Sequence, residues 1–287
     1  MKTERSRILL ALAAVYLVWG STYLAIRYAL EGFPPFFLAG ARFAVAGAIA
    51  YAIARARGAA HPTGAQWRSA AIVGTLLVFG NGCVVIAEQW VTSSVAAVAI
   101  ASVPLWIALF AGLFGRWPSR GEWIGLAVGL GGVALLQTGG DLRASPAGAL
   151  VLTAGCVSWS LGSIYSGRLP LPKGLISSAA QMFAGGLVML AVALVRGERI
   201  AAAPSAHAVL ALVYLTIFGS IVAYTAYQFL LSKVRPTLAA SYAYVNPVVA
   251  VGLGAALAGE TVAPRALGAL ALILGGVALI AFRRRAA

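Results

Sequence analysis

Polar and aromatic side chains stand inside long apolar stretches of this sequence, among mainly aliphatic neighbours. A polar group in such surroundings is costly unless it is hydrogen-bonded or faces a cavity. Rings and amides together favour a cavity for a small molecule that is partly polar and partly flat. For each residue taken alone, packing between helices is the competing interpretation. The candidate cavity residues are Trp19, Ser21, Tyr23, Arg42, Asn81, Trp159, Ser163, Tyr224, Tyr227, Gln228, Tyr242, Tyr244 and Asn246.

Arg42 and Glu88 are charged residues whose surroundings in the sequence are mainly apolar. Arg42 needs a compensating partner there, and the candidates are Glu31, Glu88, helix carbonyl groups or a substrate carboxylate. Glu88 is flanked on both sides by long apolar runs, which makes it the candidate proton site. The competing interpretation of Glu88 is a hydrated residue in a loop.

The sequence lacks the usual combinations of catalytic residues. It has no G-x-x-x-x-G-K-[ST] phosphate loop and no H-E-x-x-H pair, and His61 and His207 lie between the apolar runs. Cys83 and Cys156 each lie inside an apolar run, as expected of small buried hydrophobic residues. We therefore expect no catalytic residues, no metal and no cofactor, and an intramembrane enzyme is the cross-class alternative.

The composition indicates lipid as the solvent. Of the 287 residues, 61% are hydrophobic and only 10% are charged, against about 25% charged in typical soluble domains. The net charge of +14 comes from Lys and Arg scattered between apolar runs. Nucleic-acid binding would need these charges clustered on one face or in a tail, so it is excluded.

The runs free of charge predict ten spanning helices, each of which needs roughly 20 mainly apolar residues. The second run reaches that length if its helix begins at Pro35 and tolerates Arg42. Prolines 35, 146, 236 and 264 stand where first helical turns are expected. The runs are 8–26, 43–54, 69–87, 89–115, 123–140, 144–167, 174–195, 208–232, 236–259 and 266–282.

The basic residues predict the orientation of the chain in the membrane. The N-terminus, alternate loops and the C-terminus carry 15 Lys and Arg residues, whereas the remaining loops carry four. Because short cytoplasmic loops are enriched in Lys and Arg, both termini are expected in the cytoplasm.

An internal repeat relates the two halves of the sequence. Leu130–Leu136 reads LGGVALL and Leu274–Ile280 reads LGGVALI, and a Gly-Ser-x-Tyr motif occurs at Gly20–Tyr23 and again at Gly162–Tyr165. Each half then holds five spans, and an odd number places the second half inverted in the membrane. Inverted repeats are typical of secondary transporters, in which two similar halves expose one site alternately to each side.

Two prolines occupy equivalent places in this repeat. Pro104 and Pro247 lie deep inside the fourth and ninth spans, and each removes a backbone hydrogen bond. A static kink is one interpretation; a paired hinge or gating element, in which broken helices expose carbonyl groups to a cavity, is the other.

The sequence resembles the drug/metabolite transporter superfamily, within it the EamA-domain exporters. The motifs are Trp19–Tyr23 (WGSTY), Phe79–Gly82 (FGNG) with Ala87–Glu88, and Ser241–Val248 (SYAYVNPV) with Gly259–Glu260. The resemblance covers essentially the whole chain and implies ten helices, a central cavity and export of amino acids or related metabolites. The first half departs from the pattern, with Arg116-Trp117 where the second has Gly259-Glu260.

These observations predict an all-α integral membrane protein of the cell inner membrane, with repeats at 1–140 and 141–287. Its expected function is alternating-access export of small metabolites, chiefly neutral or aromatic amino acids or analogues. A nucleotide-sugar or lipid-carrier transporter on the same scaffold is the alternative. The partners are a small molecule and the bilayer, proton coupling is left open, and so is the oligomeric state.

Overall fold

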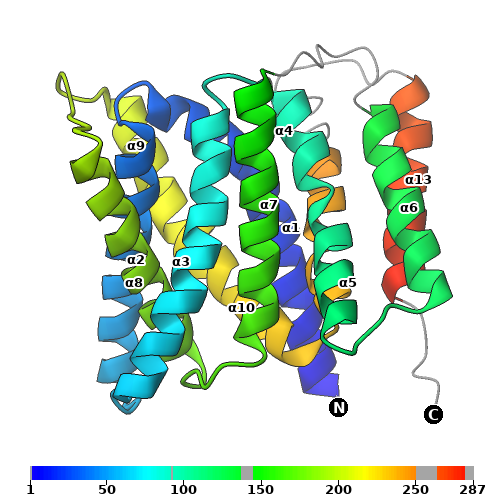
Figure 1. Ribbon diagram of the computed structural model, residues 1–287, viewed down its shortest axis with the longest axis horizontal. Coiled ribbons are helices and arrows are strands. Elements are labelled where there is room, and N and C mark those ends of the chain that lie inside the picture. The colour runs from blue at the N-terminus through cyan, green and yellow to red at the C-terminus, as the bar shows by residue number, and fades with distance from the viewer. Residues whose placement is uncertain (1, 92, 137–144, 250–263, 282–287) are drawn as a thin grey trace.

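The computed structural model describes residues 2–91, 93–136, 145–249 and 264–281, and the regular elements in this part of the chain are helices (Figure 1). They are α1 (Lys2–Leu30), α2 (Pro35–Ala56), α3 (Gly64–Ala87), α4 (Ser93–Ile100), α5 (Val103–Leu113), α6 (Arg120–Leu136), α7 (Pro146–Ser166), α8 (Leu175–Val195), α9 (Ala206–Tyr214), η1 (Leu215–Val222), α10 (Ala223–Lys233), α11 (Pro236–Ala239) and α13 (Pro264–Ala281). Residues 242–249 are also helical.

Six segments of the described chain are long and apolar enough to cross a membrane. They are α1, α2, α3, α7, α8 and the continuous stretch Ala206–Lys233, with mean hydropathies of 1.5 to 2.2. Val98–Leu113 and Leu267–Ala281 are shorter apolar helical stretches. Every one of the ten expected spans contains helix among the described residues. The all-helical prediction is confirmed, while the inverted relation of the halves stays a prediction.

Local sequence fixes several helix starts. Pro35, Pro146 and Pro236 each occupy the first helical position, where a missing N–H costs nothing. The Ser145 hydroxyl accepts a hydrogen bond from the Gly148 amide at 3.0 Å. Thr63 and Gln66 form a reciprocal capping box at the start of α3.

The fourth span is two helices rather than the single helix expected over 89–115. α4 ends at Ile100 and α5 begins at Val103, with Pro104 in its first turn. Side chains of α7 bond to the carbonyl groups near the break: Cys156 Sγ donates to Ala99 O and Ser160 Oγ to Val103 O. A proline break inside the bundle is tolerated because neighbouring side chains satisfy freed backbone groups.

The eighth span changes helix type in its middle. Between α9 and α10 the chain forms η1, a π-helix of eight residues. π-Helices are rare, and those that interrupt α-helices are frequently found at functional sites. Gly219 and Ser220 lie buried within η1.

Glycines allow helices of the two halves of the sequence to approach closely. α2 packs along α8, and α3 along α7 and α8. A Cβ added at Gly47 would lie 2.3 Å from the Phe183 nitrogen, and one at Gly74 2.1 Å from the Gln181 oxygen. Small residues at such contacts are what membrane helices use to associate.

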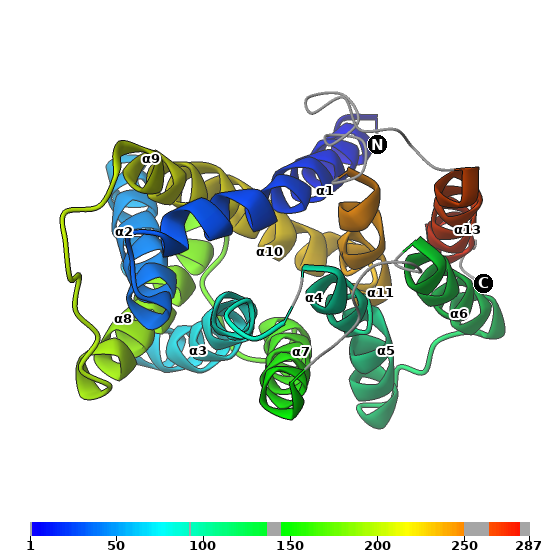
Figure 2. The same ribbon diagram turned by 90° about the horizontal axis from the view of Figure 1, so that it is seen from above.

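The helices form one bundle with a separate pair at its edge. Figures 1 and 2 both show α6 and α13 side by side, outside the group formed by α1, α2, α3 and α7–α10. Gly125 of α6 faces Gly276 of α13, with 2.8 Å from an added Gly125 Cβ to the Gly276 oxygen. The pocket described next lies away from this pair, among α1, α2, α3, the α4–α5 break, α7 and residues 242–249.

Candidate functional site

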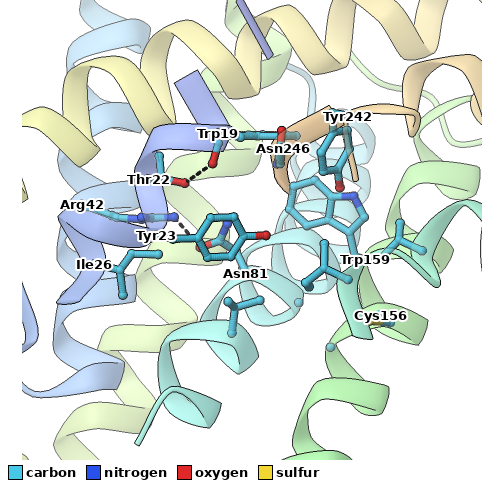
Figure 3. A pocket seen from close by; sticks show the side chains of 15 residues that line it. Trp19, Thr22, Tyr23, Ile26, Arg42, Asn81, Cys156, Trp159, Tyr242 and Asn246 are labelled. Carbon is cyan, nitrogen blue, oxygen red and sulfur yellow. Dashed lines mark hydrogen bonds between the residues drawn. The ribbon is translucent and has the colours of Figure 1, made fainter. Parts of the chain in front are cut away.

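A pocket lies between helices from both halves of the sequence (Figure 3). α1, α2, α3 and the α4–α5 break line it from the first half, and α7 and the helical stretch 242–249 from the second. Its cavity volume is about 60 Å³. This volume is small for an organic solute, so the lining side chains must move apart before a molecule as large as an amino acid can enter. The lining residues are Trp19, Thr22, Tyr23, Ile26, Arg42, Gly80, Asn81, Val84, Ile100, Val103, Gly155, Cys156, Trp159, Tyr242 and Asn246.

An aromatic cluster forms one end of this pocket. Trp19 makes edge contacts with Trp159 (ring centroids 5.4 Å apart) and with Tyr242 (4.6 Å). Tyr227 does not line the pocket but packs against both indoles, and its hydroxyl bonds with Ser163 (2.7 Å) and accepts from Trp159 Nε1 (3.3 Å). These bonds hold the Trp159 ring in place.

The polar end of the pocket contains Arg42. Its side chain is 2% exposed, and one guanidinium nitrogen, Nη2, donates to the Asn81 side-chain oxygen. Nε and Nη1 are buried and have no hydrogen-bond partner. No carboxylate of the described residues pairs with Arg42, so neither Glu31 nor Glu88 is its partner.

Asn246 and Thr22 complete the polar lining. With its amide oriented to suit its neighbours, Asn246 donates to the Tyr242 carbonyl oxygen at 3.0 Å. The Thr22 hydroxyl donates to the Trp19 carbonyl oxygen at 2.8 Å. The Asn246 amide also donates to the Tyr16 carbonyl oxygen of α1 at 3.3 Å, so Asn246 links its own helix to α1, whereas Thr22 is bonded within α1.

Seven of the candidate cavity residues line this one pocket: Trp19, Tyr23, Arg42, Asn81, Trp159, Tyr242 and Asn246. Whether they bind a substrate stays a prediction. Among the other lining residues, Gly80 and Gly155 carry no polar or aromatic group that could mark them in a sequence.

The remaining candidates lie elsewhere. Tyr244 is buried against α6 and donates to the Leu126 carbonyl oxygen at 3.1 Å. Tyr224 donates to the Gln181 side chain at 3.0 Å. Ser21 bonds with the Tyr214 hydroxyl at 2.7 Å. Ser163, Tyr227 and Gln228 are likewise absent from the lining. The eighth span was expected to line the cavity, but its Gly219 and Tyr227 instead contact the lining residue Trp19.

Glu88 follows directly after α3, whose last residue is Ala87. Both of its carboxylate oxygens are buried and have no hydrogen-bond partner. Burial raises the pKa of this carboxyl to about 7, and the charge of Arg27 acts in the opposite direction. Glu88 lies four residues after the lining residue Val84, about one helical turn further along the chain, and is not itself among the lining residues.

The two prolines differ in their surroundings. Pro104 lies at the break between α4 and α5, beside the lining residue Val103. Pro247 lies inside the helical stretch 242–249, beside the lining residue Asn246, and the chain breaks earlier, at Ala240–Ser241. A hinge at either proline stays a prediction. Among the described residues no group of three or more His, Cys, Asp or Glu side chains could hold a metal ion.

Apolar helices of membrane length around a buried, partly polar pocket are features of membrane transport proteins. The chain belongs to the EamA-like transporter family, whose model matches residues 6–138 and again 146–282. It is therefore a multi-span membrane transporter, and the predicted membership of the drug/metabolite transporter superfamily is confirmed.

The chain is similar to two named proteins and to one solved structure. It is 44% identical to "Uncharacterized inner membrane transporter YedA" of Escherichia coli K12, over 94% of this chain and 89% of that protein. It is 27% identical to "Probable terminal-alkyne amino-acid exporter" of Streptantibioticus cattleyicolor, over 96% and 93%. A crystal structure 24% identical in sequence shares the fold, with a TM-score of 0.79 over 96% of each chain.

Proposed function

We propose that this transporter exports neutral or aromatic amino acids, or close analogues of them, by alternating access. The observation that carries the proposal is the pocket shared by both halves, with indole and phenol rings at one end and amides and hydroxyls around them. A neutral amino acid matches both parts, since its side chain packs on the rings and its backbone groups find hydrogen-bonding partners.

The lining argues against the other substrate classes considered. Nucleotide sugars and lipid carriers bear several phosphate charges, but Arg42 is the only cation among the lining residues. Unpaired charge is costly to bury, so a polyanion is poorly served. A wholly apolar solute would leave the desolvated amides without partners. One distant relative is named as a probable amino-acid exporter, which supports the same class.

Alternating access accounts for the narrow cavity. Trp19 of the first half meets Trp159 and Tyr242 of the second, so a relative motion of the halves would part these rings. We propose that both termini lie in the cytoplasm of a cell whose inner membrane the protein spans, and that the two halves are inverted relative to each other.

The test is transport by purified protein in proteoliposomes. Vesicles loaded with labelled phenylalanine, leucine or a nucleotide sugar should release the amino acids faster than protein-free vesicles, with and without a proton gradient. Release of the nucleotide sugar alone would contradict the proposal. Trp123→Phe, an exposed tryptophan of α6 away from the pocket, serves as the control variant.

A further inference from the structure

The pocket contains a cation whose charge nothing in the described protein balances. Arg42 is 2% exposed and lines the pocket, yet Nε and Nη1 lack partners. A guanidinium is always charged, and a buried charge without a counter-charge is strongly unfavourable. A purely structural arginine would be expected to have its N–H groups satisfied.

The neighbours of Arg42 hold it without neutralising it. The Asn81 oxygen accepts one hydrogen from Nη2, and the Phe43 ring lies under the guanidinium, with 4.6 Å from the Arg42 Cζ to the ring centroid. Neither contact neutralises the positive charge of Arg42, and both fix the plane of its guanidinium group. The N–H groups of Nε and Nη1 and the second N–H of Nη2 therefore remain as donors. The second Nη2 hydrogen runs parallel to a hydrogen on either Nε or Nη1, and such a parallel pair is the geometry that a carboxylate fits.

We infer that Arg42 is the anion subsite of the pocket and that the transported molecule carries a single carboxylate bound there. Figure 3 shows the Arg42 side chain directed from α2 towards Asn81 and Tyr23, within the same pocket as Trp19, Trp159 and Tyr242. One cation matches one negative charge. The amide nitrogen of Asn81 offers a further donor to the same carboxylate.

The inference rests on the proposed function and makes it more specific. It requires that removal of the carboxylate charge from a substrate weakens binding more than removal of its ammonium group does. It also requires that Arg42 confer this preference, because the remaining lining residues are neutral.

The experiment compares three ligands that share one ring: phenylalanine, phenylalaninamide, which lacks the carboxylate, and 3-phenylpropanoate, which lacks the ammonium group. Binding to purified protein in nanodiscs is measured by competition and by thermal shift. We expect the wild type to bind both acids at least about 10-fold more tightly than the amide, since bonds to charged groups are worth about 1.5–3 kcal/mol.

The variants assign the preference to one residue. Arg42→Gln should bind acid and amide within about threefold of each other, and Arg42→Lys, which keeps the charge but loses the planar fork, should lie between. Arg57→Gln, at an exposed arginine directly after α2, should keep the wild-type ratio. Because Arg42→Gln removes an uncompensated buried charge, the unliganded variant should be as thermally stable as the wild type or more so.

The outcomes separate this inference from the proposed function. If the wild type binds 3-phenylpropanoate through Arg42 but binds no amino acid, the anion subsite stands and amino-acid export is wrong. If Arg42→Gln retains the acid preference, or if no carboxylate binds, the anion subsite is wrong.

Discussion

The indole N–H of Trp19 donates to the carbonyl oxygen of Gly219, 3.0 Å away and 200 positions along the chain. This bond joins α1 to the π-helix η1. A π-helix leaves the α-helical i→i−4 pattern, and here one of its carbonyl groups is bonded to a side chain that also lines the pocket. The two ends of this bond therefore connect the pocket to the irregular segment of the eighth span.

Trp19→Phe should lower the stability of the protein by about 1 kcal/mol, because it keeps an aromatic ring but removes the donor to a buried carbonyl group. Reversible unfolding in mixed micelles measures the change. Trp123→Phe, at an exposed site on α6, should leave the unfolding curve unchanged. Equal curves for the wild type and Trp19→Phe would show that this bond contributes nothing.

Tyr242 and Tyr244 provide a matched pair, since both are buried and only Tyr242 lines the pocket. Tyr242→Phe should raise the KM for amino-acid efflux roughly three- to tenfold, the effect of one hydrogen bond of about 1 kcal/mol. Its unfolding curve should change little. Tyr244→Phe should leave the KM unchanged and lower the stability, because it loses the bond to the Leu126 carbonyl oxygen. The site assignment fails if Tyr242→Phe transports like the wild type.

The same two tyrosines show what the sequence could predict. Both were candidate cavity residues because each is a polar aromatic residue in an apolar stretch. Successive helical residues are about 100° apart, so two residues separated by two positions face nearly opposite sides. The choice between them depends on tertiary packing, which places Tyr244 against Gly129 of α6 and leaves Tyr242 beside Trp19.

The helical character and most span positions followed from uninterrupted apolar runs, whereas the irregular segments did not. η1 keeps the apolar composition of its neighbours and differs from them only in hydrogen-bond pattern. The break between α4 and α5 lies at Ala101–Ser102, where the residues are as compatible with helix as those around them. Only Pro104 marked that break, and a proline alone does not distinguish a kink from an interruption.

Reporter fusions test the predicted topology. A reporter placed after Arg285 should report the cytoplasm, and one inserted within 139–146 should report the opposite side, because alternate loops carry 15 and four basic residues. Reporters on the same side would contradict the ten-span arrangement. If the two reporters lie on opposite sides but the one after Arg285 is outside the cytoplasm, the ten-span fold stands and the assignment of the two membrane faces is reversed.

Glu88 predicts a pH dependence of stability. The carboxyl has a raised pKa of about 7 in the folded protein, against an ordinary value of 4.5. Between these two values the folded form holds a proton that the unfolded form has released. Stability is therefore greatest below pH 4.5 and declines as the pH rises to 7, after which the contribution of Glu88 is constant.

Glu88→Gln should remove this dependence, because glutamine imitates the protonated carboxyl at every pH. The melting temperatures of the two proteins should agree near pH 4.5, and Glu88→Gln should melt higher at pH 8. Glu31→Gln, at an exposed acid directly after α1, should keep the wild-type profile. If a proton on Glu88 also drives export, Glu88→Gln should retain exchange of amino acid across the vesicle membrane but lose accumulation driven by a pH gradient. Identical melting profiles for wild type and Glu88→Gln from pH 4.5 to 8 would exclude Glu88 as a proton site.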